Sequence, residues 1–114
     1  MRRANLAMVL DCVDPEALAA FWTQALGYER AGAVEQFVVL RGDEGDTPLL
    51  LQRVPESKQV KNRMHVDIHV PDVESKVREL ETAGATRRAE NSIGEMRWIT
   101  MTDPEGNEFC VCPG

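Results

Sequence analysis

Apolar and polar residues alternate strictly along the segment from residue 64 to residue 70. One set of alternate positions is wholly apolar and the other wholly polar: Met64, Val66, Ile68 and Val70 against His65, Asp67 and His69. Successive side chains of a β-strand point to opposite faces of the sheet. We therefore expect a strand whose apolar side packs beneath a helix and whose polar side lines an open face.

Two segments carry apolar residues at the three- to four-residue spacing of an amphipathic helix. The first follows Asp14, which suits an N-cap, and Pro15, whose missing N–H costs nothing at the first helical position. It ends at Gly27, a residue that readily takes the left-handed conformation of a helix end. The second helix is expected to begin after Asp72 and to end at Gly84.

Strand-like runs surround both helices and give the two halves of the chain the same order. Strands are expected at residues 6–13, 29–33, 36–40, 48–54, 64–70, 86–90, 96–102 and 108–111. Asp14 and Asp72 lie 58 positions apart, which is half the chain. The sequence predicts an α+β fold of two βαβββ modules, with curved mixed sheets that form a concave cavity. We expect one domain, residues 1–114, with halves of about 1–57 and 58–114.

Length and charge restrict the classes of function. The chain has 114 residues, enough for one hydrophobic core, and a formal net charge of −6. A net acidic chain without a basic stripe is unsuited to nucleic acid. No stretch reaches the roughly 18 apolar residues of a membrane span. The first six residues lack an apolar run of signal-peptide length, and three cysteines are an odd number, so we expect a cytoplasmic protein with reduced thiols.

The internal repeat projects His65 onto the first half of the chain. Shifting by 58 positions relates His65 to Ala7 and Cys110 to Gln52, so these four residues are predicted to occupy equivalent positions in the concave site. Trp98 alternates with threonines on its own strand. It is expected either to stack on a ligand or to fill the core.

Several motifs resemble a known superfamily over nearly the whole chain. They are Asp14-Pro15, Phe21-Trp22, Ala25-Leu26-Gly27, the run from Lys61 to Asp67, and Asp103-Pro104-Glu105-Gly106-Asn107 before the last strand. Together they resemble the vicinal oxygen chelate superfamily of glyoxalases, bleomycin-resistance proteins and dioxygenases, in its glyoxalase-like subgroup. The resemblance implies paired βαβββ modules around a small-molecule site, and it favours a homodimer.

The resemblance also implies metal-ligand positions at Ala7, Gln52, His65 and Cys110. His65 matches, Gln52 offers a weak amide oxygen, Ala7 offers nothing, and Cys110 replaces a carboxylate by a thiol, which favours softer metals. Glu108 would need a shifted register to substitute. We therefore predict no cofactor and no conventional metal site, with a divalent metal at His65 and Gln52 as the alternative.

Other residues keep two interpretations each. His65, Asp67 and His69 are either hydrogen-bonded polar groups of a wet cavity or, for two adjacent members, ligands of one ion. Cys110 is either inert lining or a thiol paired with His65. The linker at residues 55–63, with its three cationic side chains, is either solvated or a rim that steers an anionic ligand.

Three functions remain in view, all with a small-molecule ligand. The first is a glyoxalase-like protein, of lyase or isomerase type if it is an enzyme, in which His65, Asp67 and His69 supply acid–base groups. Gln52, Trp98, Cys110 and Ala7 would then contact the ligand. The second is a module that sequesters a drug or metabolite without catalysis. The third is a metal enzyme with an unusual ligand set.

Overall fold

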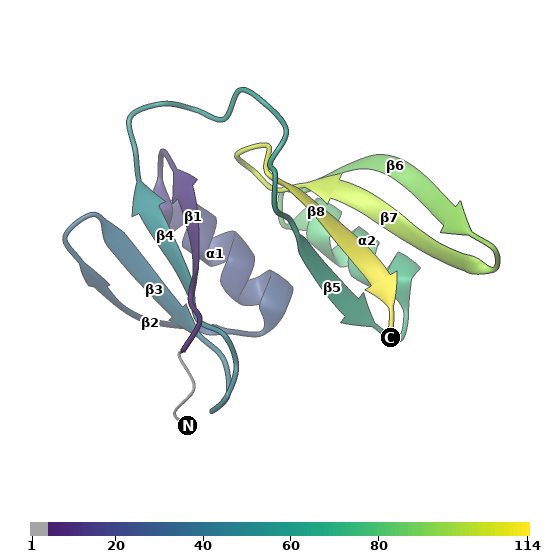
Figure 1. Cartoon of the computed structure of the whole chain (residues 1–114), viewed down its shortest axis with the longest axis horizontal. Helices are drawn as coiled ribbons and strands as arrows, with labels where there is room; N and C mark the ends of the chain where they lie inside the picture. Colours follow the sequence, from purple (N-terminus) through teal and green to yellow (C-terminus); the bar gives the residue numbers. More distant parts are fainter. Residues whose placement is uncertain (1–4) are drawn as a thin grey trace. The chain divides into compact units, whose positions relative to one another are not determined.

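The computed structural model describes residues 5–114 (Figure 1). The chain divides into two units, Met1–Ser57 and Lys58–Gly114, each with one helix and a four-stranded mixed sheet. The α+β class and the repeated β-α-β-β-β order are confirmed. The single-domain organisation and the cavity formed by both modules stay predictions. Residues 1–4, which entered the prediction of compartment, lie outside the described residues.

Unit 1 consists of β1 (Met8–Cys12), α1 (Pro15–Leu26), β2 (Glu29–Val34), β3 (Phe37–Arg41) and β4 (Leu49–Arg53). The strand order is β1-β4-β3-β2, with β1 parallel to β4 and the other pairs antiparallel. Asp14 caps α1 by accepting a hydrogen bond from the Ala17 amide at 3.1 Å. Gly27 takes the left-handed conformation, with φ of 72°. Both ends of α1 are thus where the sequence predicts them.

The core of unit 1 lies between α1 and the central strands β3 and β4. The rings of Phe21 and Trp22 meet edge to face, with centroids 5.3 Å apart. Burying a large apolar side chain contributes about 1.5–3 kcal/mol. The buried set is Leu18, Phe21, Trp22 and Ala25 of the helix with Val38, Leu40, Leu49 and Leu51 of the sheet.

Unit 2 repeats the arrangement with β5 (Val66–Val70), α2 (Val73–Thr82), β6 (Thr86–Ile93), β7 (Met96–Thr102) and β8 (Glu108–Pro113). The strand order is β5-β8-β7-β6, and β5 is parallel to β8. Asp72 caps α2 through the Ser75 amide at 3.1 Å. Both units therefore place a parallel strand pair, formed by their first and last strands, at one edge of the sheet.

The single helix of unit 2 covers one face of its sheet and leaves the other face uncovered by a helix of this unit. α2 packs on β6, β7 and β8, so the residues facing it are buried. They are Val77 and Leu80 of the helix with Ile68, Ile99, Met101, Phe109 and Val111 of the sheet. The alternate residues of the same strands point to the other side. Among the described residues, neither helix has the length and hydropathy to cross a membrane.

Element boundaries differ from the sequence-based expectation at strand ends. β5 begins at Val66, so His65 precedes the strand and Met64 is exposed instead of packing beneath the helix. β6 continues to Ile93, where it still pairs with Met96 of β7, and its register shifts between Arg87 and Ala89. α2 ends at Thr82, two residues before Gly84.

Candidate functional site

The side of the unit 2 sheet that faces away from α2 carries most of the polar residues predicted for the site. Asp67 pairs with Cys110, His69 with Cys112, and Thr100 with Cys110. Paired residues of neighbouring strands share a face, as do alternate residues of one strand. We name this side the polar face of unit 2; it comprises Asp67, His69, Trp98, Thr100, Cys110 and Cys112 of the strands, with His65 just before β5 in contact with Asp67.

A histidine–carboxylate pair lies at the start of β5. His65 Nε2 is 3.2 Å from Asp67 Oδ1, and the two side chains are 43% and 46% exposed. Their contact places His65, which precedes β5, on the same side as Asp67, and the exposure of the imidazole leaves it open to a ligand. A carboxylate at this distance accepts a hydrogen bond from the ring N–H and so orients the ring.

Two groups of three potential ligands share Asp67. In the first, the ligand atoms of His65, Asp67 and Cys110 all lie within 4.8 Å of one another. In the second, Asp67, His69 and Cys112 meet the same condition. Every member except Cys112 is predicted from the sequence, and the same-face spacing of Cys112 from Cys110 is the signal that points to it.

Both thiols of the polar face are in environments that oppose ionisation. Burial raises the pKa of Cys110; a contact with the Thr100 hydroxyl at 3.7 Å partly offsets this, and the Asp67 charge adds to it. Burial and the Asp67 charge likewise raise the pKa of Cys112. Both thiols are therefore protonated near pH 7, which does not favour Cys110 as a nucleophile.

The strand register changes the predicted equivalence between the halves. In unit 1 Met8 of β1 pairs with Leu49 of β4, and in unit 2 Val66 of β5 pairs with Phe109 of β8. Equivalent residues are therefore 58 positions apart in the sequence for β1 and β5, but 60 positions apart for β4 and β8. Gln52, the partner of Asp11, therefore corresponds to Cys112 instead of Cys110. Two more residues separate the paired positions in unit 2 than in unit 1, which preserves the face but moves the register.

The unit 1 positions contribute little ligating chemistry. Ala7 is exposed and lies just ahead of β1, and its side chain has no donor or acceptor. Gln52 is partly buried on the face shared with Asp11.

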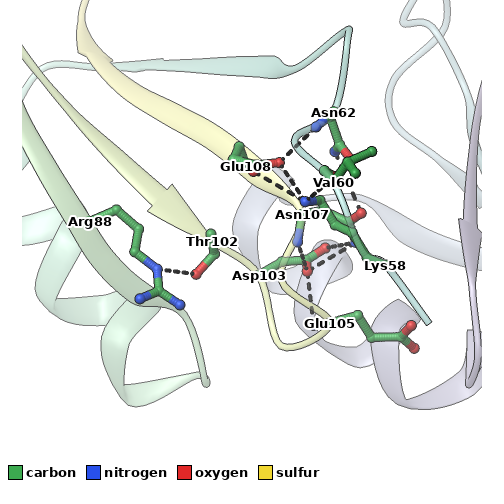
Figure 2. Close-up of polar contacts among 9 residues, drawn as sticks. All are labelled: Lys58, Val60, Asn62, Arg88, Thr102, Asp103, Glu105, Asn107 and Glu108. Atoms are coloured by element: carbon green, nitrogen blue, oxygen red, sulfur yellow. Dashed lines mark hydrogen bonds and ion pairs between the residues drawn. The ribbon is translucent and has the colours of Figure 1, made fainter.

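The linker is held to unit 2 by an ion pair (Figure 2). Lys58 Nζ lies 3.1 Å from Glu108 Oε1 and donates to the Val60 carbonyl at 2.6 Å. The Asn62 amide donates to the same carboxylate at 3.0 Å. Burial alone would raise the pKa of Glu108, but the bonds from Asn62 and Lys58 hold it below its ordinary value. Lys58 is thus paired with Glu108, and the Glu108 carboxylate already accepts hydrogen bonds from Lys58 and Asn62.

A buried aspartate shapes the turn that leads into β8. Asp103, 3% exposed, accepts hydrogen bonds from the Glu105 amide at 2.9 Å and from both the backbone and the side-chain amide of Asn107 (Figure 2). These bonds fix the turn before the strand that carries Cys110 and Cys112. The motif from Asp103 to Asn107 therefore has a structural role, because it fixes where β8 begins and so the positions of Cys110 and Cys112.

Comparison with known families gives one match that spans most of the chain. A family model described as a glyoxalase-like domain matches residues 7–112. No curated protein matches the chain in sequence.

Solved structures show the same fold at low sequence identity. A glyoxalase/bleomycin resistance protein/dioxygenase family enzyme from Burkholderia phytofirmans PsJN is 21% identical, with a TM-score of 0.78 over 96% of this chain and 98% of that one. The fosfomycin resistance protein FosX from Listeria monocytogenes, complexed with Mn(II) and sulfate ion, is 15% identical, with a TM-score of 0.82 over 100% and 92%. A bleomycin-binding protein from Streptomyces verticillus, complexed with copper(II)-bleomycin, is 22% identical, with a TM-score of 0.66 over 100% and 98%.

The residues present fit a manganese site poorly. Mn(II) prefers oxygen ligands, whereas the polar face of unit 2 combines imidazole, carboxylate and thiol. Such a mixed set suits a softer ion such as Zn²⁺. Ala7 cannot complete the ligand set that the resemblance implies.

Proposed function

The chain belongs to the glyoxalase-like domain family, and from this premise we propose that it binds a small organic molecule on the polar face of unit 2 and moves a proton with His65. The observation that carries the proposal is the 3.2 Å contact between His65 Nε2 and Asp67 Oδ1. The reaction class is that of a lyase or isomerase that removes a proton next to a carbonyl group.

The geometry of the pair assigns a role to each atom. Because Nε2 faces Asp67, Nδ1 is the imidazole nitrogen left to exchange a proton with a ligand. With Nε2–H donated to Asp67, the ring accepts the proton of the ligand at Nδ1. General base catalysis of this kind contributes about 10²–10⁴-fold to a rate.

Trp98 is the aromatic surface that the polar face of unit 2 offers to a ligand. A cavity of about 480 Å³ in unit 2 lies instead on the α2 side of the sheet, because Val73, Glu74 and Ile99 line it together with Trp98. The proposed ligand therefore binds on the open polar face and not in this cavity. Trp98 is partly exposed, so it is available for stacking and does not lie in the core beneath α2.

Sequestration without catalysis is the second candidate. Both thiols are protonated and Ala7 is inert, so a ligand could bind here by shape and stacking alone. The likeness to a bleomycin-binding protein supports this alternative.

We also propose, from the resemblance, that the protein is cytoplasmic and that it forms a homodimer. Sedimentation at several protein concentrations would test the homodimer.

The experiment that separates the candidates uses a panel of α-hydroxycarbonyl compounds in D₂O. Proton transfer appears as deuterium incorporation at the carbon next to the carbonyl, and calorimetry gives affinity. In the enzyme, His65→Ala lowers the exchange rate about 10²–10⁴-fold and changes affinity only a few-fold. Met64→Ala is the matched control, because Met64 is an exposed neighbour on the same segment. Binding without exchange in the wild type would favour sequestration.

A further inference from the structure

The second ligand group lies toward the C-terminal ends of β5 and β8, one step beyond the His65–Asp67 pair. His69 and Cys112 are direct register partners across the parallel strands, and Asp67 lies two residues before His69 on the same face. Their ligand atoms lie within 4.8 Å of one another, so small rotamer changes bring all three onto one ion. The group offers one nitrogen, one carboxylate oxygen and one sulfur.

The imidazole of His69 is held in the orientation that ligation needs. Its Nδ1 is 3.2 Å from the Pro113 carbonyl oxygen, and the Gly114 amide donates to the Val70 carbonyl at 3.0 Å. A Cβ on Gly114 would stand only 2.6 Å from the Cβ of His69, so the glycine allows the chain to pack against the ring. A bond from Nδ1–H to a backbone carbonyl is the usual support of a metal-bound histidine, and it leaves Nε2 free.

We propose that Asp67, His69 and Cys112 bind a borderline-soft divalent cation of the Zn²⁺ type. This site is distinct from the His65 and Cys110 positions that the resemblance implies, and it goes beyond the proposed proton transfer. Three protein ligands leave a fourth position for water or a ligand atom. Asp67 and His69 are exposed and Cys112 is half-buried, which gives an ion access to the site. The thiol of the other group, Cys110, is buried.

Ion binding has a defined proton balance. The Cys112 S–H bond breaks, its proton goes to solvent, and a sulfur–metal bond forms, with no change in oxidation state. The cation then neutralises the Asp67 charge that opposes ionisation of this thiol.

The test uses the full chain, freed of metal and kept reduced, with Co²⁺ as a spectroscopic probe and Zn²⁺ as its competitor. Co²⁺ should bind at one per chain, with a thiolate-to-cobalt charge-transfer band that Zn²⁺ abolishes. Cys112→Ser and His69→Ala should weaken Co²⁺ binding about 100-fold or more, since even supporting contacts are worth 10–100-fold. Cys110→Ser and His65→Ala are the matched controls and should retain the band.

A second measurement needs no variant and so does not depend on how the variants fold. Zn²⁺ should slow alkylation of Cys112 in the wild type, located by peptide mass, much more than alkylation of Cys110. The proposal is overturned if Co²⁺ gives no band, if the band depends on Cys110 and His65, if all four variants lose it equally, or if Zn²⁺ leaves Cys112 unprotected.

Discussion

Replacing Asp103 by alanine should destabilise unit 2 more than any surface change in the same turn. Asp103 is buried and accepts hydrogen bonds from three N–H groups: the backbone amides of Glu105 and Asn107 and the side-chain amide of Asn107. Hydrogen bonds to a charged partner contribute about 1.5–3 kcal/mol each, and donors left unpaired add a desolvation cost. Because such contributions are not additive, we expect a loss of about 3–5 kcal/mol in the free energy of unfolding.

Urea unfolding followed by circular dichroism measures this loss. With a slope of about 1–3 kcal/mol per molar, the midpoint should fall by about 2 M. Glu105→Ala is the matched control, since alanine keeps the backbone N–H that Asp103 binds, and it should shift stability by no more than about 0.5 kcal/mol. If Asp103→Ala costs less than about 1 kcal/mol, or no more than Glu105→Ala, the turn does not depend on this carboxylate.

Three further predictions follow from other contacts of unit 2. Glu108→Gln should cost about 1 kcal/mol at neutral pH, because it weakens the pair with Lys58. The pKa of Glu108 is lowered in the folded chain, so the contribution of this carboxylate to stability is present above the ordinary carboxyl range and is lost as the pH falls through the folded-state pKa. The urea midpoints of variant and wild type should therefore converge in acid, and a gap that stays constant with pH would refute this prediction. Phe109→Ala should cost about 3–5 kcal/mol in thermal or urea unfolding because the ring is fully buried, whereas exposed Ile93→Ala should be near neutral, and equal effects would place Phe109 outside the core. Gly114→Ala should weaken Zn²⁺ binding about 10-fold by displacing the supported imidazole, and an unchanged calorimetric affinity would show that this packing does not matter.

Local patterns predicted the elements well because their causes are local. Asp14 and Asp72 cap the helices through amides three residues away, within the reach of a short side chain. The alternation around Asp67 also gave the correct polar face, since strand geometry fixes parity.

Register and long-range pairing could not be obtained in this way. Parity says which face Cys112 occupies, but only the hydrogen-bonded ladder between β5 and β8 shows that it lies opposite His69. The cationic linker gave no sign that Lys58 would bind Glu108, which is fifty positions away in the sequence. Such contacts depend on how the chain closes its turns, and the buried network of Asp103 carries no periodic signal.

The most direct test of the account is a double-mutant cycle on the proton-transfer pair. Deuterium incorporation would be measured for the wild type, His65→Ala, Asp67→Asn and the double variant, with the compound that exchanges fastest in the wild type. If Asp67 acts through His65, the double variant exchanges no more slowly than His65→Ala, and Asp67→Asn alone lowers the rate with little change in affinity. Multiplicative losses in the double variant, or full exchange in His65→Ala, would contradict the proposed role of this pair.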